Sequence, residues 1–262
     1  MKTILVGVDF TKSSNNTISY AVEIAKQSKS KILLFHALTA PAIHTTSGLV
    51  FMTGDEFAKD AGLQMKELQT HLSAKNKAVK FDIEITNSGI RDKVQQLASQ
   101  NKISLVVLGL ETKSKMSVFL NGTTSLDLTG KINCPIITIS EKYKHHKIKK
   151  MLIAVDNKET ISSALSKRIH SVIKFLGVDA EFVHIKTEYE LEINQKVNKQ
   201  ITVTNIKANN IEEGITSYAK KSKADIVMLI SNNYNAFYSL FVDHHSKKII
   251  LSSNIPVLSI HK

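Results

Sequence analysis

Two features of the chain have the chemistry to hold a phosphorylated ligand. Asp9 closes the first apolar run of the sequence, and Gly109 closes a later one, where a glycine lets the chain turn sharply. Gly122, Thr123 and Ser125 stand where a helix is expected to begin. Such a position offers backbone N–H groups, hydroxyls and the positive end of a helix dipole to an anion. A loop that leaves a strand and returns to a helix N-terminus is what a phosphate tail requires.

These residues need a scaffold that brings distant strand ends together. Apolar runs alternate with segments of helical periodicity, which predicts an α/β fold of βαβ units around a parallel sheet. Strands are expected at 3–8, 31–37, 79–86, 104–109 and 135–140, with helices at 14–28, 55–75, 89–100 and 123–131. In a doubly wound, Rossmann-like sheet of order 3-2-1-4-5 the first and fourth strands are neighbours. Asp9 and Gly109 therefore face one crevice.

The pattern occurs twice along the chain. Residues 148–156 (Ile-Lys-Lys-Met-Leu-Ile-Ala-Val-Asp) repeat the opening run, and the step from Gly109 to Pro135 equals the step from Ile230 to Pro256, 26 residues in each case. A repeat of this length indicates a duplicated domain. Strands are expected at 150–155, 179–185, 201–206, 225–230 and 256–260, with helices at 160–175, 188–198, 210–222 and 243–252.

The duplication predicts two domains. The first covers 1–142 and the second 147–262, each a doubly wound parallel sheet of five strands, joined by the basic run Lys142–Lys150. A solvated linker is the simplest interpretation of that run.

Local composition predicts two further features of the first domain. Ser13 and Ser14 are expected to cap the helix at 14–28. The segment Thr39–Gly54, with its proline, glycine and hydroxyls, is expected to be a loop or short lid over one end of the sheet.

Composition restricts the classes of protein to consider. The chain has 262 residues, a formal net charge of +12, one cysteine and no tryptophan. Cys134 has no intramolecular disulfide partner, and no apolar run is long enough for a transmembrane helix. We expect a cytoplasmic protein without a membrane partner. Nucleic-acid binding is not expected, since no zinc spacing, helix-turn-helix signature or aromatic-rich basic face accompanies the charge.

No catalytic or metal-binding set emerges from the sequence. Phosphate-binding P-loop and Gly-x-Gly-x2-Gly patterns are missing, and no Ser/His/Asp set can be assembled. The pairs His145-His146 and His244-His245 have no partner at metal-ligand spacing. His36 and His184 occupy equivalent positions in the second strand of each half and are interpreted as structural.

The motifs around Asp9 and Gly109 resemble those of the universal stress protein family in its tandem two-domain form. The ATP-binding branch carries Gly-x2-Gly-x9-Gly-(Ser/Thr) after the fourth strand, and this chain has Gly109-x2-Thr112-x9-Gly122-Thr123. The opening strand of the family ends in an aspartate, as in Val8-Asp9-Phe10-Thr11. The resemblance implies an adenine nucleotide alpha hydrolase-like fold and a bound adenine nucleotide (ATP, ADP or AMP).

The resemblance also assigns roles to individual positions. Asp9 and the strand-end Ala37 would hold adenosine, and the phosphates would lie along the loop. The complete set of expected nucleotide-binding residues is Val8, Asp9, Ala37, Gly109, Thr112, Gly122, Thr123, Thr124 and Ser125.

Two residues of the loop depart from the family pattern. Thr112 replaces a glycine that lets the backbone approach phosphate, and Glu111 brings a negative charge that would repel a polyphosphate. Lys113 and Lys115 offset that charge if they fold back. A shorter phosphate tail or a weaker affinity is consistent with these changes.

The second half lacks the glycines of the expected phosphate-binding loop. Its corresponding stretch runs Ile230-Ser-Asn-Asn233-x9-Asp243-His244, with no glycine and with a carboxylate at the helix start. Asp156 alone remains, and a strand-end aspartate is often only a turn residue. We expect this domain to bind no nucleotide and to act as an intramolecular pseudo-dimer partner, covering the first domain through the proline-led fifth strands.

The leading functional hypothesis is a nucleotide-responsive module in a stress response, acting on a signalling partner that the sequence does not identify. Catalysis is not expected, although slow ATP hydrolysis stays open, as does any role of Mg²⁺. A homodimer is also expected. The alternatives are a scaffold with vestigial clefts, or a site for a different small ligand such as a lipid or metabolite beneath residues 39–54.

Overall fold

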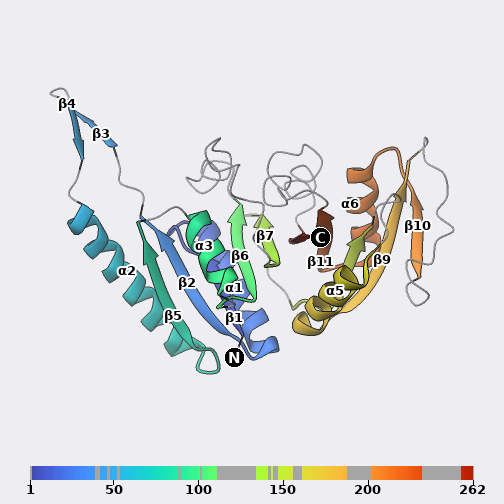
Figure 1. Cartoon of the computed structure of the whole chain (residues 1–262), viewed down its shortest axis with the longest axis horizontal. Coiled ribbons are helices and arrows are strands. Elements are labelled where there is room, and N and C mark those ends of the chain that lie inside the picture. Colours follow the sequence, from blue (N-terminus) through green and yellow to red (C-terminus); the bar gives the residue numbers. More distant parts are fainter. Residues whose placement is uncertain are drawn as a thin grey trace.

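The computed structural model describes residues 2–38, 42–45, 48–51, 54–87, 90–100, 102–110, 134–140, 143, 147–155, 161–187, 202–231 and 255–261. The helices expected at 123–131, 188–198 and 243–252 lie outside these residues. Figure 1 shows the first half of the chain (blue to green) beside the second half (yellow to red).

The first half follows the predicted order of elements. Its main strands are β1 (Thr3–Gly7), β2 (Lys31–Ala37), β5 (Phe81–Thr86), β6 (Leu105–Leu110) and β7 (Ile136–Ser140). Its described helices are α1 (Lys12–Ser28), α2 (Gly54–Lys75) and α3 (Ile90–Ser99). Each lies within two residues of its predicted bounds, because long apolar runs and amphipathic stretches are strong local signals.

One segment differs from the prediction of a loop. Within 39–54 the chain forms an antiparallel hairpin of β3 (Ala42–Thr45) and β4 (Gly48–Phe51), in which Ala42 pairs with Phe51 and Thr45 with Gly48. β-Branched residues are frequent in these strands, and they favour extended backbone. The neighbouring proline, glycine and hydroxyl residues concealed that signal.

The second half repeats the arrangement. Its described strands are β8 (Lys150–Ala154), β9 (Asp179–Lys186), β10 (Val203–Lys207), β11 (Ile226–Ser231) and β12 (Val257–His261). Its described helices are α5 (Ser163–Leu176) and α6 (Ile211–Ser222).

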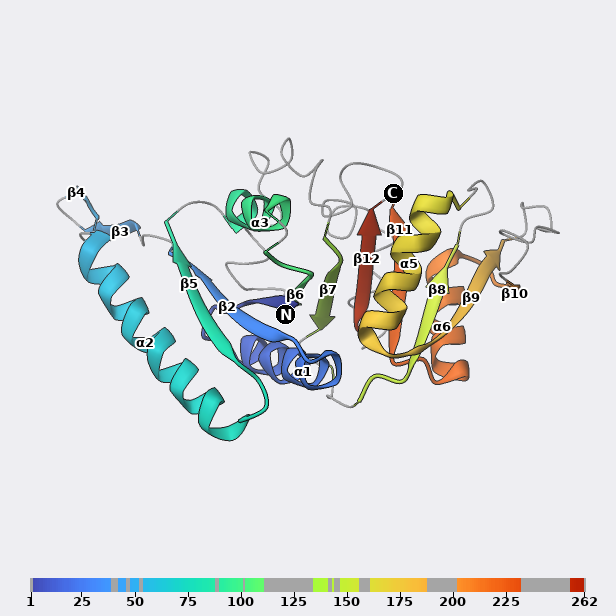
Figure 2. The ribbon, with the colours of Figure 1, turned by 60° about the horizontal axis from the view of Figure 1, so that its bottom comes forward.

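The described strands, apart from the hairpin, form one ten-stranded sheet of order β10-β9-β8-β11-β12-β7-β6-β1-β2-β5. Counted within each half, this is the order 3-2-1-4-5, so the predicted fold class is confirmed. The two five-stranded sheets are continuous because the fifth strands pair: β7 and β12 run antiparallel, with Val257 opposite Thr138 and Ser259 opposite Ile136. Figure 2 shows these strands side by side between the halves.

Helices cover both faces of the sheet, and each face has its own core. Residues of α1, α2 and α5 share one apolar cluster, whereas residues of α3 and α6 share the other. Strand β1 supplies both, since Ile4 and Val6 enter the first cluster and Leu5 the second. This arrangement explains why the strand is continuously apolar.

Helix ends are held by short-range contacts. The side chain of Thr11, rather than Ser13 or Ser14, caps α1 by accepting a hydrogen bond from the Ser14 backbone N–H. Ser162 caps α5 in the same way, and α5 ends at Gly177 with φ of 62°. Glycine tolerates that left-handed backbone at no steric cost.

Candidate functional site

The carboxyl ends of β1, β2 and β6 form the candidate site. The register of β1 against β2 pairs each residue with the one 28 positions later (Thr3 with Lys31), and its continuation sets Asp9 beside Ala37. The register against β6 has a step of 101 and its last pair is Val6 with Val107, so an extension by two residues would set Val8 level with Gly109. The ladder does continue past Gly7, because the Val8 N–H donates to the Phe35 carbonyl oxygen at 2.8 Å. The fold therefore brings the strand ends that carry Val8, Asp9, Ala37 and Gly109 to the same edge of the sheet.

Asp9 is half-buried and held by the turn that starts α1. Its Oδ1 accepts hydrogen bonds from the Thr11 hydroxyl (2.7 Å) and from the Thr11 backbone N–H (3.1 Å). The Asp9 N–H donates to the Ser14 hydroxyl oxygen at 3.3 Å. Oδ2 has no hydrogen bond to any described residue, so Asp9 keeps one oxygen available as an acceptor at a fixed position.

An aromatic pair lies next to Asp9. Phe10 has φ of 60° and is 40% exposed, and its ring centroid lies 4.9 Å from that of His36 at an interplanar angle of 50°. The Nδ1 of His36 lies 2.7 Å from the Val8 carbonyl oxygen. Because that oxygen only accepts, Nδ1 carries the proton. The left-handed backbone at a bulky residue is strained, a feature often found at functional sites.

Sequence reasoning did not assign this pair to the site. The sequence predicts a structural role for His36, and its hydrogen bond to the Val8 carbonyl oxygen agrees with that prediction. Phe10 was visible only as part of the motif around Asp9. Its signal is an aromatic residue immediately after a strand-end aspartate, and its exposure depends on the turn.

The expected phosphate-binding residues Thr112, Gly122, Thr123, Thr124 and Ser125 lie outside the described residues. Gly109 lies within β6, half-exposed and paired with Ile139 of β7. Of the expected ligand-binding residues, the structure therefore describes Val8, Asp9, Ala37 and Gly109.

The second half has the same two hydrogen bonds at the end of its first strand, and we call this arrangement in each half the backbone frame. The Val155 N–H donates to the Val183 carbonyl oxygen at 2.9 Å, and Nδ1 of His184 lies 3.1 Å from the Val155 carbonyl oxygen. The position equivalent to Ala37 is Ile185, one residue after the histidine in both halves. Ile185 is 4% exposed, and the α-carbon of Gly214 lies so close that an added Cβ would meet Ile185 Cγ2 at 2.5 Å.

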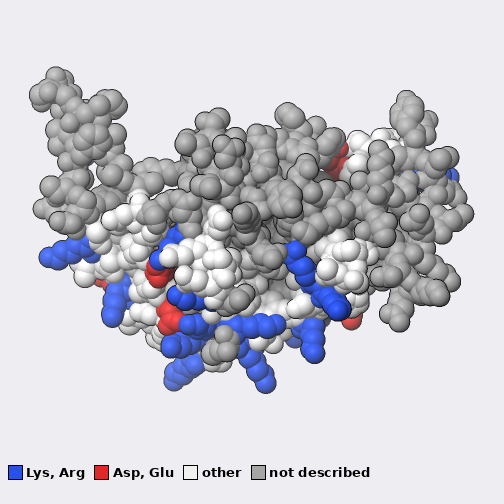
Figure 3. Space-filling view, in the orientation of Figure 1, with Lys and Arg blue, Asp and Glu red and all other residues white. Residues whose placement is uncertain are grey.

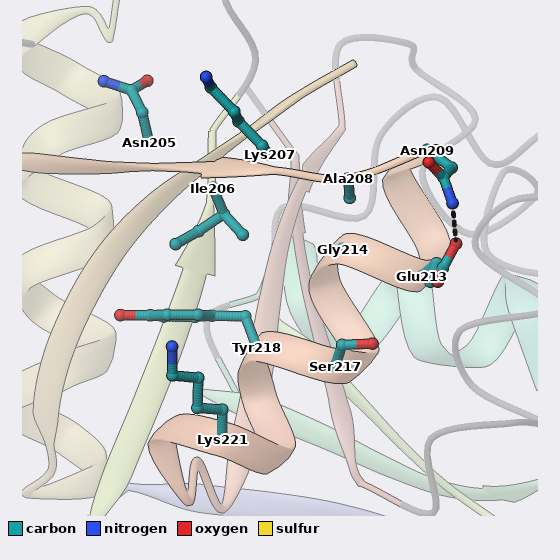
Figure 4. Close-up of a pocket in the computed structure, with 10 residues that line it drawn as sticks. All are labelled: Asn205, Ile206, Lys207, Ala208, Asn209, Glu213, Gly214, Ser217, Tyr218 and Lys221. Atoms are coloured by element: carbon teal, nitrogen blue, oxygen red, sulfur yellow. Dashed lines mark hydrogen bonds between the residues drawn. The ribbon is translucent and has the colours of Figure 1, made fainter. Parts of the chain in front are cut away.

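A cavity of about 450 Å³ lies beside this frame, between β10 and α6 (Figure 4). At one end the Tyr218 hydroxyl donates to Oε1 of Glu181 at 2.5 Å, and Lys150 contacts Oε2 of Glu181 at 2.8 Å. Hydrogen bonds from Lys150 and then from Tyr218 lower the pKa of the Glu181 carboxyl, and the bond to Glu181 raises the pKa of Tyr218. None of the predicted ligand-binding residues lines this cavity.

The described residues contain neither a metal-binding cluster nor a membrane-spanning helix. No group of three or more His, Cys, Asp or Glu side chains is arranged to hold a metal ion there. No helix in the same part of the chain is long and apolar enough to cross a membrane.

Comparison with known proteins agrees with this architecture. Residues 1–140 match the family described as the universal stress protein family. No curated protein matches the chain.

Similar solved structures extend over the whole chain. A universal stress protein from Archaeoglobus fulgidus DSM 4304 has a TM-score of 0.67 at 16% identity, covering 99% of this chain and 96% of its own. A functionally unknown protein from Pseudomonas aeruginosa PAO1 has a TM-score of 0.53 at 12% identity, covering 100% and 92%. The cytoplasmic domain of a prokaryotic cation chloride cotransporter has 0.54 at 11%, covering 98% and 94%. At these identities the similarity concerns the fold alone.

Proposed function

Because the chain belongs to the universal stress protein family, we propose that its first half binds an adenine nucleotide at the carboxyl edge of β1 and responds to that nucleotide as a signal. The observation that carries the proposal is the Asp9 carboxylate. Thr11 fixes one of its oxygens, and the other has no partner among the described residues, at the edge where the neighbouring strand β2 ends in the small residue Ala37.

The position of this edge in the sheet supports a ligand site. Strand β1 lies between β2 and β6, where the strand order reverses, and ligands of open α/β sheets bind outside the carboxyl ends at such points. In the proposed complex, Oδ2 of Asp9 accepts a hydrogen bond from a ribose hydroxyl, and Val8 and Ala37 border the adenine. The exposed ring of Phe10 gives the entrance an apolar wall.

The phosphates are assigned to the loop after β6. We propose that Gly109, Thr112 and the run Gly122–Ser125 surround them with backbone N–H groups and hydroxyls. Thr112 and Glu111 make a short tail, as in AMP or ADP, the better match. Binding rather than catalysis is proposed, with at most slow ATP hydrolysis, because the sequence offers no evident general base or pair of metal-binding carboxylates beside the phosphate loop.

The second half is proposed to be a supporting domain, 147–262, that binds no nucleotide. Ile185 takes the position of Ala37 and is buried against Gly214, so the space beside the strand end is filled. Asp243 would bring a negative charge to the phosphate position.

The proposed pseudo-dimer affects how a homodimer would form. Strands β7 and β12 are both interior, because β7 lies between β6 and β12 and β12 lies between β11 and β7. A homodimer of the whole chain would need a different surface, and light scattering of the purified protein measures whether one forms.

The experiment is titration calorimetry with ATP, ADP and AMP, beside mass spectrometry of small molecules released from the purified protein. Ala37→Phe should weaken nucleotide binding about tenfold or more by filling the adenosine position, a loss of about 1.4 kcal/mol. Asp9→Asn keeps an acceptor for Thr11 but removes the charge, and should weaken binding less.

The matched control is Asp156→Asn, the equivalent change in the second half, which should leave binding unchanged. A wild-type protein that binds no adenine nucleotide, or an Ala37→Phe variant that binds as well as wild type, would reject the site. The scaffold hypothesis would then become the leading one.

A further inference from the structure

The two halves meet a second time, away from the paired strands, at the C-terminal ends of α1 and α5. Gln27 near the end of α1 donates from Nε2 to the carbonyl oxygens of Leu176 (2.6 Å) and Gly177 (3.1 Å) at the end of α5. A cavity of about 380 Å³ opens beside this contact. We call it the seam pocket, and its described lining is Lys2, Gln27, Ser28, Lys29, Ser171, Lys174, Phe175 and Gly177.

Three lysines surround the seam pocket, and no described lining residue is acidic. All three side chains are exposed, and none forms an ion pair with a described carboxylate. The ammonium of Lys2 lies 4.6 Å from the centre of the Phe175 ring, so a cation–π contact directs it toward α5. Figure 3 shows Lys and Arg side chains gathered along the lower rim of the molecule, the rim where Figure 1 places the N-terminus.

A nearby lysine, Lys31, is arranged differently, because it has a carboxylate partner. Lys31, at the start of β2, lies 2.8 Å from Asp82. The chain thus neutralises one lysine of this edge and leaves the three of the seam pocket without a described counterion. A concave surface lined by charges of one sign concentrates counterions, and lysine ammonium groups bind phosphate as point charges.

Helix dipoles offer a competing explanation. Lys29 follows the last turn of α1 and Lys174 lies in the last turn of α5, where cations are favourable. Lys2 precedes β1 and belongs to no helix. Its ammonium nevertheless lies over Phe175, in the last turn of α5, so the dipole of α5 favours this cation as well. What the dipoles leave unexplained is that lysines from both halves line one concave surface.

We propose that the seam pocket binds a soluble polyanion with several phosphate groups, through Lys2 and Lys29 of the first half and Lys174 of the second. The bound anion removes the repulsion among the lysines and joins the two halves. The site lies at the amino end of β1, whereas Asp9 lies beyond its carboxyl end, so it is separate from the proposed nucleotide site and does not depend on it.

The test uses the full chain and inorganic tripolyphosphate, which lacks the nucleoside that the other site would recognise. Tripolyphosphate should raise the melting temperature and give saturable binding that weakens as ionic strength rises. The double variant Lys29→Gln/Lys174→Gln should bind at least about tenfold more weakly, an effect of about 1.4 kcal/mol. Lys220→Gln, an exposed lysine in the last turn of α6, is the matched control and should bind like wild type.

Each result decides the proposal. Equal weakening by Lys220→Gln would show diffuse attraction to net charge and overturn it, as would the absence of saturable binding. Lower stability of the double variant with unchanged affinity would assign the lysines to the helix dipoles alone. Binding to phosphatidylserine vesicles without binding to tripolyphosphate would identify a lipid surface instead. Ala37→Phe should retain tripolyphosphate binding, which separates this site from the nucleotide site.

Discussion

The carboxyl ends of β1 and β8 have the same hydrogen-bond frame but different surroundings. In each half a valine N–H bonds the next strand, and a histidine Nδ1 bonds the valine carbonyl. His36 is half-exposed against Phe10, whereas His184 is 2% exposed. The residue after each histidine differs as well, since Ala37 is small and half-exposed while Ile185 is buried against α6.

The comparison separates a structural feature from accessibility to a ligand. The shared hydrogen bonds hold the end of the first strand of each half, whether the neighbouring strand end is exposed or buried. The exposure of the strand end depends on the residue after the histidine, Ala37 or Ile185. It also depends on how closely a helix packs there, as α6 packs against Ile185. A histidine bonded to a strand-end carbonyl is therefore no evidence for a binding site by itself.

The largest predicted effect comes from removing the buried histidine. His184→Ala should lower the free energy of unfolding by about 2–4 kcal/mol, since it leaves a cavity and an unbonded Val155 carbonyl. His36→Ala, the matched change at a half-exposed position, should cost about 1 kcal/mol. Urea denaturation followed by circular dichroism measures both. Equal losses of unfolding free energy would contradict the structure, in which His184 is more buried than His36.

A smaller effect is expected where α6 approaches Ile185. Gly214→Ala should destabilise the protein by about 1–3 kcal/mol, because the new Cβ would lie 2.5 Å from Ile185 Cγ2 and 2.9 Å from the Ala208 Cβ. Adding Ile185→Ala should recover part of the loss, so the double-mutant cycle should be non-additive. Gly62→Ala is the control, since nothing lies within 4 Å of a Cβ there. Additive losses would reject the close packing that fills the second-half edge.

The smallest effect concerns one ion pair in each half. A hydrogen bond from Lys31 holds the pKa of Asp82 below its ordinary value, as Lys150 and Tyr218 do for Glu181. A carboxyl group whose pKa is lower in the folded than in the unfolded protein stabilises the fold at any pH above its unfolded-state pKa, about 4. That stabilisation is lost as the pH falls through the folded-state pKa. Asp82→Asn and Glu181→Gln should each cost less than about 1 kcal/mol near pH 7, because both pairs are partly exposed to water, which screens them.

Unfolding midpoints measured from pH 7 down to pH 3 test this prediction. The difference between wild type and each variant should shrink as the medium becomes acidic. Glu181→Gln should have the larger effect, since Glu181 also accepts a hydrogen bond from Tyr218. A difference that grows toward low pH would contradict the direction of both pKa shifts.

Local pattern predicted much of the fold, and the exceptions have physical causes. Apolar runs located the strands within two residues, and the equal steps to Pro135 and Pro256 predicted the duplicated order. The hairpin at β3 and β4 was missed because turn-forming residues around a short strand dominate its composition. Thr11, not Ser13 or Ser14, caps α1, since the helix begins at Lys12 and the Thr11 hydroxyl oxygen accepts from the Ser14 N–H. The Thr11 hydroxyl also donates to Asp9.

The sequence alone determined the ten strands of the main sheet, the described helices and the position of Asp9 after the first strand, since these depend on hydrophobic period and on residues close in the chain. Tertiary structure decided the rest. The pairing of β7 with β12, the contact of Phe10 with His36, the burial of Ile185 against Gly214 and the meeting of Lys2 with Phe175 join residues distant in sequence or depend on one backbone angle. Such contacts are set by how closely elements approach in space, which no local pattern encodes.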